Sequence, residues 1–224
     1  MATAAAAALP ALAALSEAAR AKAAGPALRS IAGALEAGGG FAERLPLRSS
    51  VDALTPDQRR WLRRQGVTIG ALDLFDPRLL KPAAQPWRRA LLQAAGAPRT
   101  MAPAQGATIF PRGAPGAVPA MGYRPIAAQA VRIDMVERIA RAVHDARDAA
   151  SPRAPFVLDP ALAVSIGLEP GTIARLMAEL GFRPAPDSEG VTRYVWRGRG
   201  RAPAPSVRPA RDNAFAALAD WGRS

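Results

Sequence analysis

A stretch of 27 residues near the middle of the chain, 96–122, limits how this sequence can fold. It contains five prolines and five glycines, and neither a helical period of 3.6 nor a strand period of 2 persists through it. We interpret it as a linker or as a loop that follows the surface. The 224 residues therefore divide into an N-terminal part, 1–95, and a C-terminal part that begins at residue 123.

Helical patterns fill the N-terminal part. Residues 1–24 are almost entirely Ala and Leu, and their positive charge follows the apolar run, which favours an Ala-rich helix over the alternative of a secretory signal. Thr55 is a good N-cap with Gln58 at the capping-box position, and residues 45–47 are predicted to be extended. Four further helices are predicted: 26–37, 55–66, 76–80 and 87–95. No segment is long and apolar enough to span a bilayer, so we expect a cytoplasmic protein.

The C-terminal part has the clearest pattern of predicted helices and strands. Asp134 begins a helix over 134–149 whose buried stripe is Ile133, Val136, Ile139, Ala140 and Val143. A short strand at 156–158, a short helix from Asp159 to Ile166 and a helix over 171–180 follow. Strands at 182–184 and 191–197 then flank a four-residue turn, 187–190. Helix, tight turn, helix and hairpin is the order of a winged helix-turn-helix.

The predicted fold class is therefore mainly α. A helical N-terminal half (1–95) is joined through the linker (96–122) to a small winged-helix-like α+β module (123–198). A disordered basic tail (199–224) ends the chain.

Charge and missing motifs exclude several classes of protein. The net charge is +12, there is no cysteine, and His144 is the only histidine, so no thiolate, Cys-type zinc or His-cluster chemistry is available. The sequence has neither a phosphate-binding loop with its lysine nor a convincing carboxylate pair. We therefore expect no catalytic activity, no cofactor and no metal. A strongly basic chain is expected to bind polyanions, of which nucleic acid is the first candidate and an anionic membrane the second.

The first candidate nucleic-acid site is a basic helix face. Four arginines recur at a spacing that places them on one broad face: Arg59, Arg60, Arg63 and Arg64. They would contact phosphates, and Trp61 could offer a stacking surface. The alternative is a solvated helix in which Trp61 and Leu62 belong to the core.

The second candidate site is the start of the 171–180 helix. Thr172 and Arg175 are expected to be exposed there and to meet a phosphate or a base edge, although Glu179 on the same face argues against close contact with a backbone. The alternative is a degenerate module that serves only protein packing.

The third candidate site is the last strand and the tail. Alternation places Arg193, Val195 and Arg197 on one face and Tyr194 and Trp196 on the other, a mixture that suits single-stranded nucleic acid. The alternative is that Tyr194 and Trp196 are core residues. The tail adds further arginines, with no acid before Asp212, and would act as an electrostatic tether for RNA: Arg199, Arg201, Arg208 and Arg211.

Three stretches of the chain carry a resemblance to a known family through their order and spacing. They are Leu62–Gly70 with Phe75–Pro82, Gly122–Arg124 with Ala130–Arg138, and Leu158–Pro160 through Gly167 and Leu176 to Glu179–Arg183. In order and spacing they resemble the region after the motor domains in superfamily-two helicases related to the RNA helicase subunit of the mitochondrial degradosome, especially bacterial members. The resemblance covers residues 25–200, and the ending Phe215–Leu218 is also similar.

The resemblance implies an accessory region that holds RNA or DNA near a helicase motor. The two RecA-like motor domains that precede this region in the family are not present in residues 1–224, so ATP hydrolysis by this chain is not implied. A split gene product, a truncated reading and a fragment all fit that departure. The implied partners are single-stranded RNA, with DNA as the alternative, and a helicase motor polypeptide or an exoribonuclease. A stand-alone winged-helix DNA-binding regulator and a structural protein-docking module remain rival hypotheses.

Overall fold

The computed structural model describes residues 10–97, 99, 101, 106–116, 118–150, 154–159, 161, 167–185 and 192–198. Three expectations from the sequence fall largely or wholly outside these residues: the short helix after Asp159, the turn at 187–190 and the basic tail from residue 199.

Helix predominates among the described residues, and it is combined with small antiparallel sheets, so the fold is α+β. The N-terminal helices are α2 (Pro10–Arg20), the 3-10 turn η1 (Lys22–Ala24), α3 (Gly25–Ala37), α4 (Arg48–Asp52), α5 (Pro56–Arg64), the 3-10 turn η2 (Pro77–Leu80) and α6 (Gln85–Ala94). The later ones are the 3-10 turn η3 (Pro119–Met121), α7 (Ile133–Ala150) and α9 (Pro170–Leu180). The helices predicted over 26–37, 55–66, 87–95, 134–149 and 171–180 are confirmed to within a few residues.

Each sheet has three short antiparallel strands. In spatial order, the first contains β1 (Phe41–Glu43), β3 (Asp73–Phe75) and β2 (Thr68–Ile69); the second β4 (Ile109–Pro111), β6 (Gln129–Arg132) and β5 (Tyr123–Ile126); the third β7 (Phe156–Val157), β9 (Arg193–Trp196) and β8 (Phe182–Ala185). The third sheet contains the predicted hairpin, with β7 added beside β9.

The first sheet adds three strands to the N-terminal half, which the sequence predicts to be helical apart from the extended segment at residues 45–47. Its strands are two or three residues long, too short for a period of 2 to show in the sequence. The extended segment predicted at residues 45–47 is wrong: the chain turns there, and the strand lies earlier, at β1. Gly39 and Gly40 precede β1 with positive φ values of 59° and 93°, a conformation that glycine adopts readily.

The predicted linker at 96–122 is in part a folded element. β4 lies within it and pairs with β6, Ile109 opposite Val131, and η3 leads directly into β5. The hydroxyl of Tyr123 donates to the carbonyl oxygen of Ala107 at 2.9 Å. A single edge strand whose partner lies about twenty residues away leaves no local periodicity, so the boundary expected at residue 123 falls inside the second sheet.

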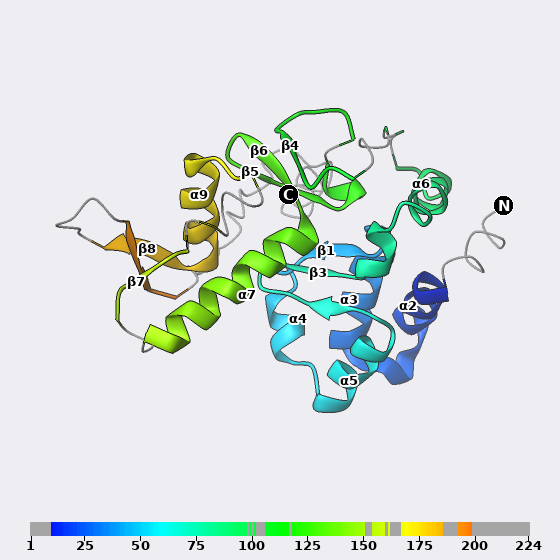
Figure 1. Cartoon of the computed structure of the whole chain (residues 1–224). Coiled ribbons are helices and arrows are strands. Elements are labelled where there is room, and N and C mark those ends of the chain that lie inside the picture. Colours follow the sequence, from blue (N-terminus) through cyan, green and yellow to red (C-terminus); the bar gives the residue numbers. More distant parts are fainter. Residues whose placement is uncertain are drawn as a thin grey trace, which may run out of the picture.

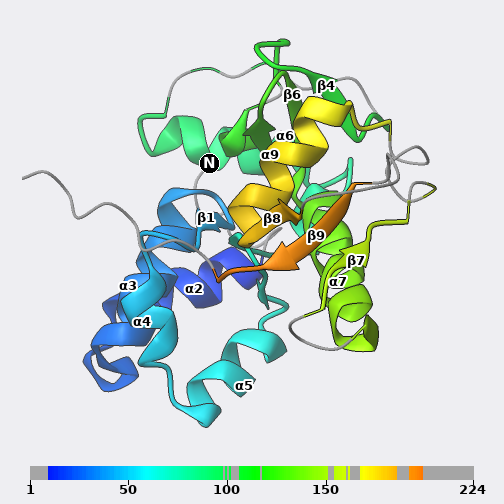
Figure 2. The same ribbon diagram turned by 90° about the vertical axis from the view of Figure 1, so that its left-hand side faces the viewer.

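α7 lies at the centre of the molecule (Figure 1). Its predicted stripe is buried, and it serves two cores: Ile133 packs into the N-terminal core with Leu15, Ile31 and Leu74, whereas the rest of the stripe packs against α9 and the third sheet. Figure 2 shows α2, α3 and α4 grouped on one side of the molecule and α7 on the other, with α9 and the second sheet above.

Candidate nucleic-acid interface

The α5 helix begins where the sequence predicts. The hydroxyl of Thr55 accepts a hydrogen bond from the backbone N–H of Gln58 at 3.2 Å, and the Gln58 side chain accepts from the Thr55 N–H at 2.9 Å, which completes the capping box. Leu62 is buried and Trp61 packs half-buried against the same core. The alternative interpretation of Trp61 as a core residue is therefore supported over a stacking role.

The four arginines of α5 are not equivalent. Arg59 donates to the carbonyl oxygen of Val51, and Arg60 pairs with Asp57 one turn earlier. Arg63 and Arg64 are exposed at the end of the helix, and neither side chain has a hydrogen bond or ion pair within the described part of the chain. These two side chains are the ones available to a phosphate.

Thr172 is not an exposed residue, which corrects the expectation from the sequence. It is fully buried in α9, where its hydroxyl lies 3.5 Å from the carbonyl oxygen of Ile126 on β5. α9 packs against β5 as well as against α7, so a position that a helix-turn-helix pattern leaves exposed is covered in this fold by the second sheet.

Arg175 is exposed on α9 but is engaged in an ion pair. Its guanidinium donates to Glu179 Oε1 at 3.0 Å one turn later. Glu179 Oε2 in turn accepts from Arg124 at 3.2 Å. The start of α9 therefore presents little free positive charge.

The β9 strand shows the predicted alternation with one correction. Tyr194 is buried beside Phe156, so it cannot stack on a base. Trp196 is on the same face but at its margin, 42% exposed, with the guanidinium of Arg147 5.3 Å from its ring. Arg193 and Arg197 are exposed. Arg199 and Arg201 lie outside the described residues.

The structure does not bring the candidate residues into one surface. Figures 1 and 2 place α5 at the foot of the N-terminal helices and β9 beyond α7, so two separate basic patches result. The patch on β9 also includes Arg183, an exposed residue of β8 whose register partner is Val195. Sequence reasoning did not select Arg183, although alternation from the buried Phe182 would have indicated its exposure.

A buried ionic group was also missed by sequence reasoning. Arg124 on β5 donates to Asp73 Oδ1 of β3 at 2.8 Å as well as to Glu179 of α9. Burial raises the pKa of the Asp73 carboxyl to about 6, because the opposing effect of Arg124 is smaller. These residues come from segments about fifty positions apart, so no local pattern could have paired them.

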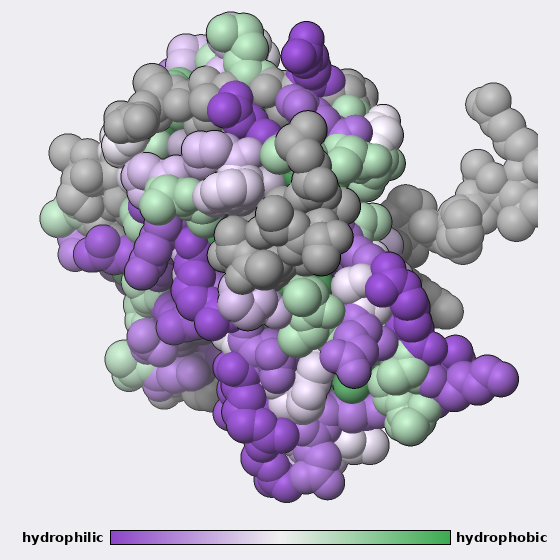
Figure 3. Space-filling model, turned by 90° about the vertical axis from the view of Figure 1, so that its right-hand side faces the viewer, coloured by the Kyte–Doolittle hydropathy of each residue, from purple (hydrophilic) through white to green (hydrophobic). Residues whose placement is uncertain are grey.

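The described residues contain no group of three or more His, Asp or Glu side chains placed to hold a metal ion. None of their helices is long and apolar enough to cross a membrane. The face shown in Figure 3 is largely hydrophilic, with hydrophobic residues in small separate patches.

No protein-family model matches the chain, and comparisons with curated proteins and with solved structures found no match.

Proposed function

We propose that this chain is a non-catalytic, nucleic-acid-binding accessory region of an ATP-dependent helicase, with single-stranded RNA as its ligand and DNA as the alternative. The observation that carries the proposal is the pair Arg63 and Arg64: two adjacent exposed cations, without a carboxylate partner in the described residues, on a chain of net charge +12. An exposed arginine without a carboxylate partner can bind a phosphate, and so release its counterion, without first breaking an ion pair.

The C-terminal part supports a winged-helix-like module. The order α7, β7, α9, β8 and β9, with β9 between β7 and β8, supports this interpretation; the short helix that the module needs before α9 falls largely outside the described residues. In this proposal β8 and β9 are the wing strands, with Arg193 and Trp196 on β9 and Arg197 directly after it. An exposed aromatic ring between arginines favours stacking on unpaired bases.

The rival regulator that reads duplex DNA is less well supported. Such a protein needs a recognition helix with several side chains that reach base edges. Along α9 the exposed positions after the first turn are Ala174 and Arg175, and Arg175 is paired with Glu179. Contact through phosphates and stacking, with little sequence preference, fits these residues better.

Fluorescence anisotropy with labelled single-stranded RNA across a salt series tests the proposal. We expect affinity to fall steeply with salt, with a slope of about −0.7 in log K against log salt for each phosphate contact. The double variant Arg63→Gln/Arg64→Gln should weaken binding and make the slope shallower by about 1.4 if both residues contact phosphate.

The matched control is the double variant Arg48→Gln/Arg141→Gln, which removes the same charge from exposed arginines that are already paired with Asp52 and Glu137. It should change the slope much less. A flat salt dependence, equal effects of the two double variants, or a strong preference for one duplex sequence would overturn the proposal.

A further inference from the structure

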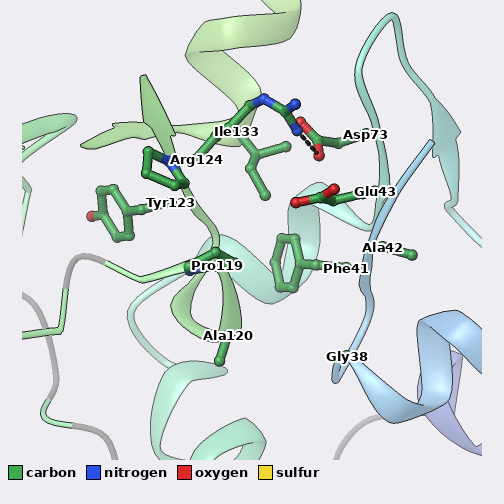
Figure 4. A pocket seen from close by; sticks show the side chains of 11 residues that line it. Gly38, Phe41, Ala42, Glu43, Asp73, Pro119, Ala120, Tyr123, Arg124 and Ile133 are labelled. Atoms are coloured by element: carbon green, nitrogen blue, oxygen red, sulfur yellow. Dashed lines mark hydrogen bonds and ion pairs between the residues drawn. The ribbon is translucent and has the colours of Figure 1, made fainter. Parts of the chain in front are cut away.

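A pocket of about 260 Å³ lies between the first sheet and the segment that leads into α7. Its walls are mainly apolar, and Figure 4 shows the rings of Phe41 and Tyr123 on either side of it, with Pro119 and Ala120 below. Glu43 and Asp73 stand together at one end; the Glu43 carboxylate points into the pocket, and the Asp73 carboxylate faces the guanidinium of Arg124 (Figure 4). The pocket is distinct from both basic patches.

The two carboxylates are held together by strand register. Glu43 on β1 and Asp73 on β3 are direct partners in an antiparallel pair, a position in which like charges repel each other. Glu43 is exposed, and its side chain has no hydrogen bond or ion pair within the described part of the chain. Asp73 is only 5% exposed, and its Oδ2 atom has no hydrogen-bond partner there either.

Carboxylates outnumber cations at this end of the pocket, where the guanidinium of Arg124 attracts both Asp73 and Glu43. Arg124 is shared between Asp73 and Glu179, and among the described residues the only other cation paired with these acids is Arg175, which serves Glu179. Three carboxylates therefore face two guanidinium groups, in a chain whose net charge is +12. Asp73 Oδ2 is a buried carboxylate oxygen without a donor, and such an atom carries a free-energy penalty.

We propose that this pocket binds a guanidinium group on a short aliphatic stem, with the guanidinium between Glu43 and Asp73 and the stem against Phe41 and Tyr123. A planar guanidinium has five N–H donors and can bond two carboxylates at once. Its stem and its flat face pack well against aromatic rings. The volume is below the range usual for drug-sized ligands, so it suits a group of side-chain size.

Charge argues against a nucleobase as the occupant. A base in the pocket would bring its phosphate towards Glu43 and the shared carboxylates, where it would be repelled. A guanidinium has two sources with the same chemistry: an arginine side chain of a polypeptide, or a free small molecule. Guanidinium binding at this pocket does not depend on nucleic-acid binding by the chain.

Isothermal titration calorimetry of the full chain with three probes tests the inference. The probes are N-butylguanidinium, the peptide acetyl-Gly-Arg-Gly-amide, and the same peptide with neutral citrulline in place of arginine. Both guanidinium probes should bind, and the citrulline peptide should bind at least about tenfold more weakly, because it lacks the charge. An arginine peptide that binds more than about tenfold tighter than N-butylguanidinium identifies a polypeptide as the source, and equal affinities identify a free guanidinium.

Variants locate the site and separate it from RNA binding. Glu43→Gln should lower the affinity of the chain for the arginine peptide about tenfold. Asp52→Asn, which removes the same charge from an exposed residue of α4, should leave this affinity unchanged. The affinity of the unsubstituted chain for the arginine peptide should rise between about pH 5 and 7, as Asp73 loses its proton. RNA affinity should be the same for Glu43→Gln and Asp52→Asn.

Three results would overturn the inference. They are equal binding of the arginine and citrulline peptides, an unchanged affinity in Glu43→Gln, and tighter binding of guanosine monophosphate than of either guanidinium probe. Because Glu43 is exposed, its replacement by Gln is expected to leave the fold intact, and circular dichroism checks this.

Discussion

Burial shifts the pKa values of two residues next to the pocket. Arg88 is fully buried in α6, where its guanidinium lies 4.0 Å from the centroid of the Phe41 ring and donates to the carbonyl oxygens of Gly38 and Gly39. Burial lowers its pKa to about 9. Asp73 shows the corresponding effect for an acid, because burial favours its neutral form.

The Asp73→Asn variant should become more stable relative to the parent as the pH rises from about 4 to 7. The unfolded chain releases this proton near the ordinary pKa of 3.8, whereas the folded chain keeps it up to about pH 6. The parent therefore loses free energy of unfolding across this window, by up to about 3 kcal/mol, and the amide does not. Urea denaturation at several pH values measures the difference, and a difference that does not change with pH would contradict the assignment.

At the scale of elements, prolines mark the edges of the sheets. Pro111, Pro125 and Pro184 lie on β4, β5 and β8, each an outer strand, whereas the central strands β6 and β9 contain no proline. Proline cannot donate a backbone hydrogen bond, so it is tolerated where one side of the strand is unpaired. The edge positions of these strands therefore follow from composition once the strands are known.

Two glycines of the α3 region should respond in opposite ways to replacement by alanine. A Cβ at Gly33, inside the helix, would meet nothing within 4 Å, so Gly33→Ala should stabilise the chain by up to about 1 kcal/mol. A Cβ at Gly38, the C-cap, would lie 1.9 Å from the backbone oxygen of Phe41. Gly38→Ala should therefore cost at least about 2 kcal/mol. Thermal unfolding of both variants checks this, and shifts in the same direction would refute it.

At the scale of the whole molecule, polar contacts join the two cores that share α7. The backbone N–H of Ala71 donates to Glu137 Oε2 at 2.7 Å, and Arg124 connects Asp73 of the first sheet with Glu179 of α9. The segment around β3 is therefore attached both to α7 and, through β5, to α9. The two parts expected from the sequence are in direct contact and share Ile133.

Removing Arg124 should weaken this connection. The Arg124→Gln variant leaves two largely buried carboxylates without their shared cation and should cost about 3 kcal/mol at pH 7. The loss should shrink below about pH 6, where Asp73 becomes neutral. The control, Arg141→Gln, removes an exposed partner of Glu137 and should cost less than about 1 kcal/mol. Equal losses in urea denaturation of the two variants would show that Arg124 does not join the cores.

Local signals in the sequence were sufficient for the longer helices and the hairpin. The capping box at Thr55, the buried stripe of α7 and the C-cap at Gly181 each depend on residues within a few positions of one another. Such short-range interactions are present in any context, so they can be read before the fold is known. The net charge and the absence of catalytic motifs are likewise properties of the sequence alone.

Only the tertiary structure decided which candidate side chains are available. Thr172 and Tyr194 are buried because β5 and β7 pack beside them, and Arg60 and Arg175 are paired with acids one turn away, whereas Arg63 and Arg64 stay exposed. The pocket with Glu43 and Asp73 exists because two strands about thirty residues apart pair in one register. Burial and pairing depend on segments far apart in the chain, and periodicity within one segment carries no information about them.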